Sequence, residues 1–490
     1  MTAGSVPGVR SDPRPAGAAR PDDRRGAPSA GRGDRTPLLQ RPLASYHLLL
    51  TSTLLLLVLG LVMVFSASIV RSYDSTGSAY ATGMKQATFI CVGLPMMLVA
   101  ARLPVRVFRA AAYPLLVAVV VLLVLVLAVG HEVKGARSWI ALPLGFNLQP
   151  AELAKLGLAI WGADLLVRKQ RLLGEHRHLL VPLLPVSGLV LVLILLQPDF
   201  GTAVSVSVVV VALLWVAGTP LRLFAGLCAF VAVAAGLLAV SAPHRVERLL
   251  SFRDPFADAG DTGYQAVQGF YALSSGGWFG LGLGASREKW SGGLPEAHTD
   301  YVFAIVGEEL GLLGTLTVLV LFAVLVYSGV RIAQRATDPF VRLAASGVTG
   351  WIAAQAIINM GAVVGLLPIT GIPLPLVSFG GSALLVTLAA IGMLLAFARQ
   401  EPGAAEALRR RGGLRGGLRQ GLRGGLRGGR SGGAGAPASA GSRRRTADAG
   451  RPVPRTPGRT AGRAPARTAP RPAPSGGRPG QGPHRPAARR

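Results

Sequence analysis

Residues 46–70 read YHLLLTSTLLLLVLGLVMVFSASIV, an apolar run that contains no Asp, Glu, Lys or Arg. A bilayer core about 30 Å thick is crossed by roughly 20 helical residues. Only a segment that satisfies its own backbone hydrogen bonds is stable in hydrocarbon. The run therefore predicts a spanning helix, and since it has full spanning length we expect it to remain uncleaved.

Similar runs recur along the chain and predict ten spanning helices, so we expect an all-α polytopic membrane protein. The fourth run is the least apolar of the ten. The predicted spans cover residues 46–70, 86–103, 110–130, 149–166, 179–197, 200–218, 223–242, 301–330, 343–367 and 382–398.

Composition divides the chain into a membrane domain and two tails. Half of the residues are hydrophobic, yet the net charge is +28. The apolar residues lie in 44–399, whereas 1–43 and 400–490 consist mainly of Arg, Gly, Pro, Ala and Ser. Such tails cannot bury enough apolar surface to fold, so we expect both to be disordered. Cys91 and Cys228 lie in apolar runs and imply neither a disulfide framework nor a metal site.

Basic residues set the predicted orientation. Short loops after even-numbered spans hold most of the Arg and Lys residues, and cytoplasmic loops carry that excess in membrane proteins. Both termini are therefore expected in the cytoplasm, and the long loop 243–300, between spans seven and eight, outside. The basic 403–430 repeat can bind RNA in soluble proteins. Beside a membrane, anionic lipid or an acidic protein is the expected partner.

Several polar residues lie where hydrocarbon disfavours them. Glu152 and Lys155 share one face of the fourth span, either as a structural ion pair or as a substrate-lining pair. Asp199 lies in a tight turn, where capping of the sixth helix is favoured over catalysis. Glu308 and Glu309 are expected to make structural pairs. Because consecutive residues point in different directions around a helix, we expect them not to share a partner.

The loop 243–300, called here the outer loop after its expected side of the membrane, combines basic, acidic and aromatic residues. Cations there suit a diphosphate or an anionic headgroup, although each Arg taken singly fits an ordinary solvated loop. Asp300 differs, because it lies where the loop re-enters the membrane at the start of an apolar helix. Partial desolvation and the helix N-terminus act on its proton affinity in opposite directions. This setting suits a general base, although spacing alone does not establish one.

Six motifs are similar to those of a known family. They are GARSWI at 135–140, the Glu152 to Lys155 segment, QPDFGT at 197–202, LPEAHTD at 294–300, GEELG at 307–311 and PLPLVSFGGS at 373–382. Together they resemble the SEDS family (shape, elongation, division and sporulation), whose members are ten-span peptidoglycan glycosyltransferases. The likeness covers residues 44–399. The 284–290 and 294–300 motifs are more similar to the cell-division branch than to the rod-shape branch.

The resemblance implies a reaction and a set of site residues. The substrate would be lipid II, polymerised at the outer face of the cytoplasmic membrane into glycan strands for the division septum. Asp300 matches the family's catalytic aspartate. Cations would stabilise the departing diphosphate, and Trp139 would stack on sugar or isoprenoid, or anchor the loop at the interface. The cation candidates are Arg137 and Lys155, followed by Arg253 and Lys289. The other substrate-binding candidates are Glu152, Asp199, Glu296, His298, Thr299 and Ser378.

The resemblance also implies partners. A class B penicillin-binding protein with transpeptidase activity and other division proteins are expected, nucleic acid is not, and a divalent cation (Mg²⁺ or Mn²⁺) would share the diphosphate charge at an unassigned site. Two other functions stay open. A lipid II flippase would need polar groups from leaflet to leaflet, whereas those seen here cluster near the outside. A pure scaffold would have no need for Asp300.

Overall fold

The protein is described here by a computed structural model. It describes residues 43–133, 136–141, 147–169, 181–222, 224–226, 228–229, 254–258, 260, 263–290 and 292–404. These residues all belong to one compact unit, Met1–Leu422, and the second unit, Arg423–Arg490, lies outside the described residues.

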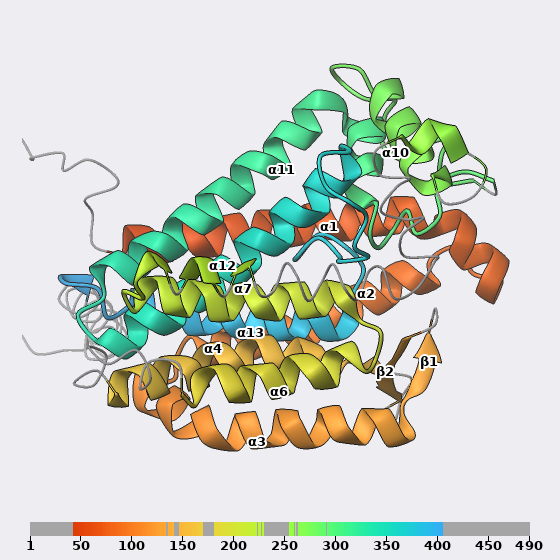
Figure 1. Ribbon diagram of the computed structural model, residues 1–490. Coiled ribbons are helices and arrows are strands. Elements are labelled where there is room, and N and C mark those ends of the chain that lie inside the picture. Colours follow the sequence, from red (N-terminus) through yellow and green to blue (C-terminus); the bar gives the residue numbers. More distant parts are fainter. Residues whose placement is uncertain are drawn as a thin grey trace, which may run out of the picture. The chain divides into compact units, whose positions relative to one another are not determined.

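Helices make up most of the described chain (Figure 1). Six of them are long and apolar enough to cross a membrane: α1 (Ala44–Thr76), α2 (Ala81–Ala100), α3 (Val105–Val129), α11 (Val302–Arg335), α12 (Pro339–Val363) and α13 (Gly381–Ala398). The others are α4 (Pro150–Arg168), α6 (Leu183–Leu195), α7 (Phe200–Val216), α10 (Tyr264–Ser275) and the short 3-10 helix η4 (Pro255–Asp258).

Every predicted span except the seventh coincides with a described helix. The seventh, 223–242, is described only at 224–226 and 228–229, and residues 243–253 of the loop that follows it lie outside the described residues, as do nearly all of both tails. Helix ends differ from the prediction by several residues. For example, α12 begins at Pro339 because the Asp338 side chain accepts a hydrogen bond from the backbone N–H of Phe340 at 2.9 Å. The described chain also continues to Ala404, beyond the predicted boundary at residue 399.

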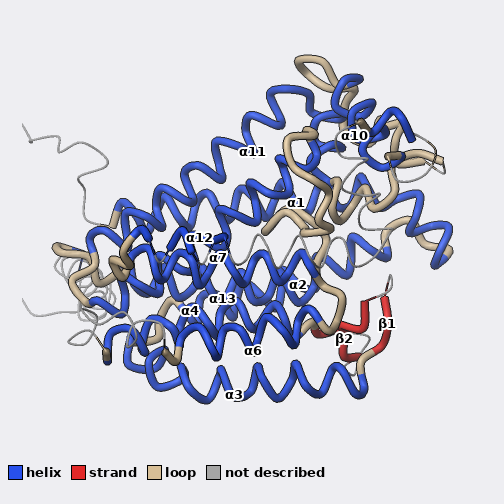
Figure 2. The backbone as a smooth tube through the Cα atoms, in the orientation of Figure 1, coloured by secondary structure: helices blue, strands red, loops and turns tan. Residues whose placement is uncertain are grey.

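The expectation of an all-helical chain is incomplete. A small antiparallel sheet follows α3, with strand order β1 (His131–Val133), β2 (Ala136–Ala141) and β3 (Asn147–Leu148). Figure 2 shows β1 and β2 beyond the end of α3. The sheet carries the predicted residues Arg137 and Trp139. Strands can pair here because the segment is a connection between helices and lies outside the predicted hydrocarbon span.

The helix α4 occupies the interior of the bundle. It packs against α3, α6, α7, α12 and α13, and its residues from Gly157 to Leu166 are all buried. Neighbouring helices shield it from lipid, which explains why the least apolar predicted span is tolerated. In contrast, α3 exposes Val117, Val121 and Val124 on its outer face.

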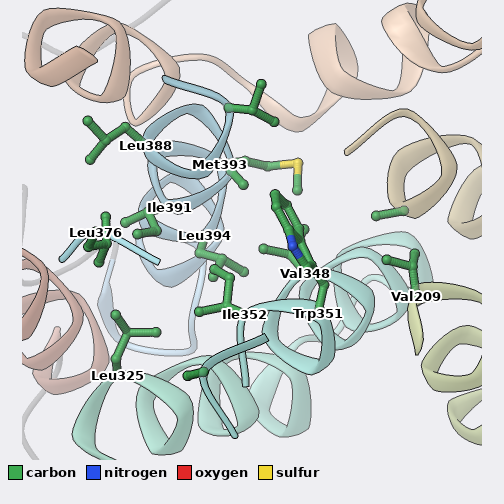
Figure 3. Close-up of a cluster of buried hydrophobic side chains, with 14 of the residues drawn as sticks. Val209, Leu325, Val348, Trp351, Ile352, Leu376, Leu388, Ile391, Met393 and Leu394 are labelled. Atoms are coloured by element: carbon green, nitrogen blue, oxygen red, sulfur yellow. The ribbon is translucent and has the colours of Figure 1, made fainter. Parts of the chain in front are cut away.

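Buried apolar side chains of α12 and α13 belong to one core cluster. Figure 3 shows Trp351 beside Val348 and Ile352, with Met393 and Leu394 of α13 close by. Trp351 is fully buried. Close packing of this kind holds membrane helices together, because burying apolar surface gains little when lipid is the alternative.

The helix α11 is broken near its N-terminus at Gly311, where φ is 67° and ψ is −162°. A break frees backbone groups that must find other partners. The loop that follows α10 supplies them: the N–H groups of Leu281 and Gly282 donate to the carbonyls of Glu308 and Glu309. In return, the N–H of Leu312 donates to the carbonyl of Gly277 at 2.9 Å. This exchange fixes the outer loop to α11.

Candidate functional site

Asp300 lies two residues before α11 begins and is half-buried. Its backbone carbonyl accepts a hydrogen bond from the Asn359 side chain of α12 at 2.7 Å. Its carboxylate lies beside Gly371, since a Cβ atom on Gly371 would be 3.7 Å from Asp300 Oδ2. Gly371 belongs to the irregular segment 368–374, called here the Gly371 loop. Asp300 is thus placed between the outer loop, α12 and the Gly371 loop.

The residues just before Asp300 form a tight turn. Glu296 adopts a left-handed conformation with φ 57°, which a non-glycine residue rarely adopts without support. Its carboxylate accepts a hydrogen bond from the Thr299 hydroxyl at 2.8 Å and pairs with Arg71 of α1 at 3.1 Å. Glu296 and Thr299 therefore stabilise the turn through these contacts.

His298 joins this turn to the chain before α13, the segment in which Ser378 lies. The backbone carbonyl of His298 accepts a hydrogen bond from the N–H of Phe379 at 2.9 Å, and the two rings lie 5.7 Å apart. Ser378 is buried and its hydroxyl accepts a hydrogen bond from the backbone N–H of Leu374 at 2.8 Å. The hydroxyl of Ser378 is therefore used inside the protein.

Glu152 and Lys155 form a buried ion pair at the N-terminal end of α4, with 2.7 Å between Lys155 Nζ and Glu152 Oε2. Lys155 also donates to Gln355 Oε1 at 3.2 Å, and its ammonium lies 4.8 Å from the centre of the Trp351 ring. Lys155 is 1% exposed. Of the two alternatives left open for this pair, the geometry favours structural pairing over direct contact with a diphosphate.

Asp199 caps α7, the alternative that the sequence favoured. Its carboxylate accepts hydrogen bonds from the backbone N–H of Thr202 at 3.0 Å and from Gln149 at 2.7 Å. Gln149 directly precedes α4, so the cap ties two helix ends together. The first turn of α7 also touches the Gly371 loop, because a Cβ on Gly201 would lie 2.8 Å from the carbonyl of Thr370.

Lys289 is occupied by a second buried pair. Its ammonium lies 3.2 Å from Glu309 Oε1, and the same carboxylate accepts the Ser66 hydroxyl of α1 at 2.6 Å. Lys289 also donates to the carbonyl of Gly284 at 2.6 Å. Lys289 therefore neutralises a buried glutamate, as expected for structural pairing of Glu309.

Glu308 and Glu309 do share a partner, so that expectation was wrong. The Ser286 hydroxyl donates to Glu308 at 2.6 Å, while the Ser286 backbone N–H donates to Glu309 at 3.3 Å. One residue can serve both carboxylates because its two donors diverge. The outer loop folds over the broken start of α11, where both glutamates are fully buried.

Glu288, in the same outer loop, has a raised pKa. Partial burial disfavours its charged form, and the neighbouring Glu308 carboxylate adds to the effect.

Arg137 is exposed on β2, where Trp139 is half-buried and pairs with His131 across the strands. Their relation to Asp300 stays a prediction. Arg253 lies outside the described residues.

An apolar cavity of about 700 Å³ lies between α10, α11 and α12. Its lining includes Trp278, Phe303, Leu316 and Met360, and none of the described residues that line it is charged. A diphosphate needs cationic partners, so this cavity does not suit the charged part of a lipid-linked sugar.

A divalent cation would need oxygen ligands from carboxylates near the turn. Glu296 and Asp300 offer the oxygen ligands that Mg²⁺ prefers, but Glu296 is engaged by Arg71 and Thr299. Within the described residues, no group of three or more His, Cys, Asp or Glu side chains is arranged to hold a metal. The described residues therefore form no complete metal site of their own, and no step is assigned to a metal.

The sequence analysis missed Arg71, Gln355 and Asn359 as members of this site. Gln355 and Asn359 were detectable, because both are amide residues inside an apolar predicted span and lie one helical turn apart. Arg71 offered a weaker signal, since a basic residue at a span end is common.

Comparison with known proteins places this arrangement in a family. A family model described as a cell cycle protein, which covers FtsW, RodA and SpoVE, matches residues 46–402. A Mycobacterium tuberculosis protein named "Probable peptidoglycan glycosyltransferase FtsW" is 45% identical over 409 residues, which cover 82% of this chain and 76% of that protein. A Legionella pneumophila protein of the same name is 40% identical, covering 73% and 92% of the two chains.

Solved structures show the same fold. One chain, from a structure described as the structural coordination of polymerization and crosslinking by a peptidoglycan synthase complex, is 31% identical with a TM-score of 0.61. The alignment covers 72% of this chain and 96% of that one. The rod shape determining protein RodA of Thermus thermophilus is 28% identical with a TM-score of 0.52, covering 72% and 96%.

Proposed function

This chain belongs to the FtsW/RodA/SpoVE family of cell cycle proteins, and we propose that Asp300 is the general base of its reaction. The chain is a peptidoglycan glycosyltransferase of cell division, which polymerises glycan strands from lipid II. The observation that carries the assignment of Asp300 is its placement. Its carboxylate faces the Gly371 loop, and its backbone is held by Asn359.

The reaction forms one bond and breaks another. As an acceptor hydroxyl oxygen attacks the anomeric carbon of the donor sugar, its proton passes to the Asp300 carboxylate, and the bond from that carbon to the diphosphate breaks. Undecaprenyl diphosphate leaves with the electron pair. A base placed within reach of the hydroxyl typically contributes a hundredfold to ten-thousandfold to the rate, in order of magnitude.

Cations must balance the charge that grows on the diphosphate. We propose Arg71 for this role, because it pairs with Glu296 in the turn before Asp300 and its side chain is 58% exposed. Arg137 stays a proposed contact because it is exposed. Lys155 and Lys289 are proposed to act indirectly, by neutralising the buried carboxylates of Glu152 and Glu309. Direct contact of either lysine with the diphosphate would require its ion pair to open.

The flippase alternative requires a continuous polar path across the membrane. On α4, the charged residues Glu152 and Lys155 lie near one end and Asp164 near the other, with only apolar residues and glycine between Lys155 and Asp164. Glu152 and Asp164 are about 18 Å apart along the helix axis. The apolar stretch favours a fixed catalytic site at one end of α4.

We also propose the setting of the enzyme. It works in the cytoplasmic membrane at the septum, with both termini inside, and with a transpeptidase of the class B penicillin-binding proteins and other division proteins as partners. The structural relative from a complex that coordinates polymerization and crosslinking supports the transpeptidase. A divalent cation during turnover stays a prediction.

The function is tested with purified protein in detergent. Lipid II is added with and without the cognate transpeptidase, and glycan polymer is measured. A polymerase makes product in detergent, whereas a flippase cannot, because detergent offers no bilayer to cross. Absence of polymer in the complete mixture, with lipid II intact, would contradict the proposal.

Orientation is tested by single cysteines in a background that lacks Cys91 and Cys228. Ser275→Cys at the end of α10 should react with a membrane-impermeant thiol reagent in wall-stripped cells. Thr337→Cys, in the exposed turn between α11 and α12, should react only after lysis. The opposite pattern would reverse the topology.

A further inference from the structure

The structure contains a pair of amide side chains to which the reaction above assigns no chemical step. Gln355 and Asn359 lie one turn apart on α12, and they are 2% and 3% exposed. Buried amides inside a membrane-spanning helix are costly unless they are hydrogen-bonded. Both of them direct their N–H groups at the Gly371 loop.

Asn359 joins two segments that are distant in sequence. Its Nδ2 atom donates to the carbonyl of Asp300 at 2.7 Å and to the carbonyl of Ile372 at 2.8 Å. One rigid amide group therefore fixes the backbone of Asp300 relative to the backbone next to Gly371. The Asp300 carboxylate faces that same glycine.

Gln355 holds the next carbonyl of the same loop. Its Nε2 atom donates to Pro373 at 3.0 Å, while its Oε1 atom accepts from Trp351 at 2.7 Å and from Lys155 at 3.2 Å. The orientation of the Gln355 amide is thus fixed by its acceptor side. One face of α12 therefore donates hydrogen bonds to two successive carbonyls of the Gly371 loop, those of Ile372 and Pro373.

We propose that Asn359 is a positioning residue for the glycosyl transfer: its amide sets the distance between the Asp300 carboxylate and the Gly371 loop, where the acceptor hydroxyl must approach. This proposal rests on the proposed function, because it takes Asp300 as the base. Displacement of a catalytic group by about 1 Å can cost on the order of a hundredfold in rate. Asn359 touches neither sugar nor diphosphate in this role.

The test uses two substitutions that share only the loss of both N–H donors. Asn359→Ala removes volume, whereas Asn359→Asp keeps the size and adds a carboxylate. In the full-length protein with its transpeptidase, both should lower kcat by roughly tenfold to a hundredfold and leave KM for lipid II within about threefold. Thr349→Val is the matched control, since Thr349 is buried on the same helix about 15 Å away. It should keep the parental kcat.

Asn359→Gln adds a graded measurement, because it keeps both N–H donors but displaces them by one methylene group, and an intermediate kcat is expected. Unchanged kcat in Asn359→Ala and Asn359→Asp, or a fall that appears only as a higher KM, would overturn the proposal. Failure of all three variants to fold would also overturn it, because Asn359 would then serve the fold alone. An inactive Asp300→Asn beside a fully active Asn359→Ala rejects the positioning role only. An active Asp300→Asn rejects the proposed base.

Discussion

The two ends of α4 carry buried charges that are arranged in different ways. At its N-terminal end, Lys155 and Glu152 are both almost fully buried and are joined to α12 through the amide of Gln355. At its C-terminal end, buried Asp164 pairs with Arg109 at 3.2 Å and with Arg168 at 2.6 Å. The side chains of these two arginines are 37% and 60% exposed.

The difference supports the proposal that the reaction takes place at the N-terminal end of α4. The arginines beside Asp164 reach solvent and lie over the rings of Phe340 and Tyr113, an arrangement that suits anchoring at a membrane surface. The pair at the other end is enclosed, and its hydrogen bonds lead through Gln355 to the Gly371 loop beside Asp300. Fixed polar groups in an enclosed site are what transition-state stabilisation requires.

The largest effect that separates the two ends is expected on polymerisation. Asp300→Asn keeps the size of the side chain but removes the proposed base, so the rate should fall about a hundredfold to ten-thousandfold while the complex still purifies. Asp164→Asn, at the opposite end, should keep the parental rate per folded molecule. The amount of glycan product formed from lipid II measures the rate of each variant. Equal losses of rate in the two variants would contradict the proposed difference between the two ends of α4.

The next effect concerns stability. Lys155→Met leaves Glu152 buried without its cation, which should cost about 3–5 kcal/mol in the free energy of unfolding. Thermal unfolding in detergent measures this loss. The double variant Glu152→Gln with Lys155→Met removes both charges and should recover most of it. At the other end, Arg168→Ala should cost less than about 1 kcal/mol, because its side chain is exposed and Asp164 keeps Arg109. A larger loss for Arg168→Ala than for Lys155→Met would contradict the comparison.

The smallest expected effect depends on pH and on Glu288 in the outer loop. Its folded-state pKa is raised by burial and by Glu308 above the ordinary value of 4.5. The folded state then binds the proton more tightly than the unfolded state, so stability falls as the pH rises from about 4.5 through the folded-state pKa and then levels off. Glu288→Gln should therefore unfold at a higher temperature than the parent at pH 7, with a difference that shrinks toward pH 4.5. A difference that does not vary with pH would exclude this origin.

Much of the fold could be predicted from the sequence, because apolar runs of spanning length have few structural alternatives in a bilayer. The Asp199 cap was equally predictable, since a carboxylate before a helix has a common local use. The Gly311 break in α11 was not predicted. It is stabilised by backbone hydrogen bonds from the loop after α10, and backbone partners across long sequence separations leave no side-chain pattern.

The site was only partly predictable for a related reason. Asp300 stood out because it lies at a span boundary and in a matched motif. Lys155 and Lys289 also stood out as cations, yet both form ion pairs with buried glutamates. Charge type is visible in a sequence, but the neighbour that neutralises it comes from the packing. For the same reason, the role of Gln355 and Asn359 becomes visible only from their hydrogen bonds to the Gly371 loop.

The most direct test asks where the substrate binds. A photo-crosslinking amino acid is placed at Thr370, in the Gly371 loop, or at Thr337, in the turn at the opposite end of the bundle. Each is combined with Asp300→Asn so that substrate is not consumed, and the proteins are irradiated in detergent with labelled lipid II, where both ends are accessible. Covalent capture is expected at position 370, where excess unlabelled lipid II should prevent it, and only background labelling is expected at position 337. Specific capture at position 337, with none at 370, would contradict the claim that the Asp300 end of the molecule is the active site.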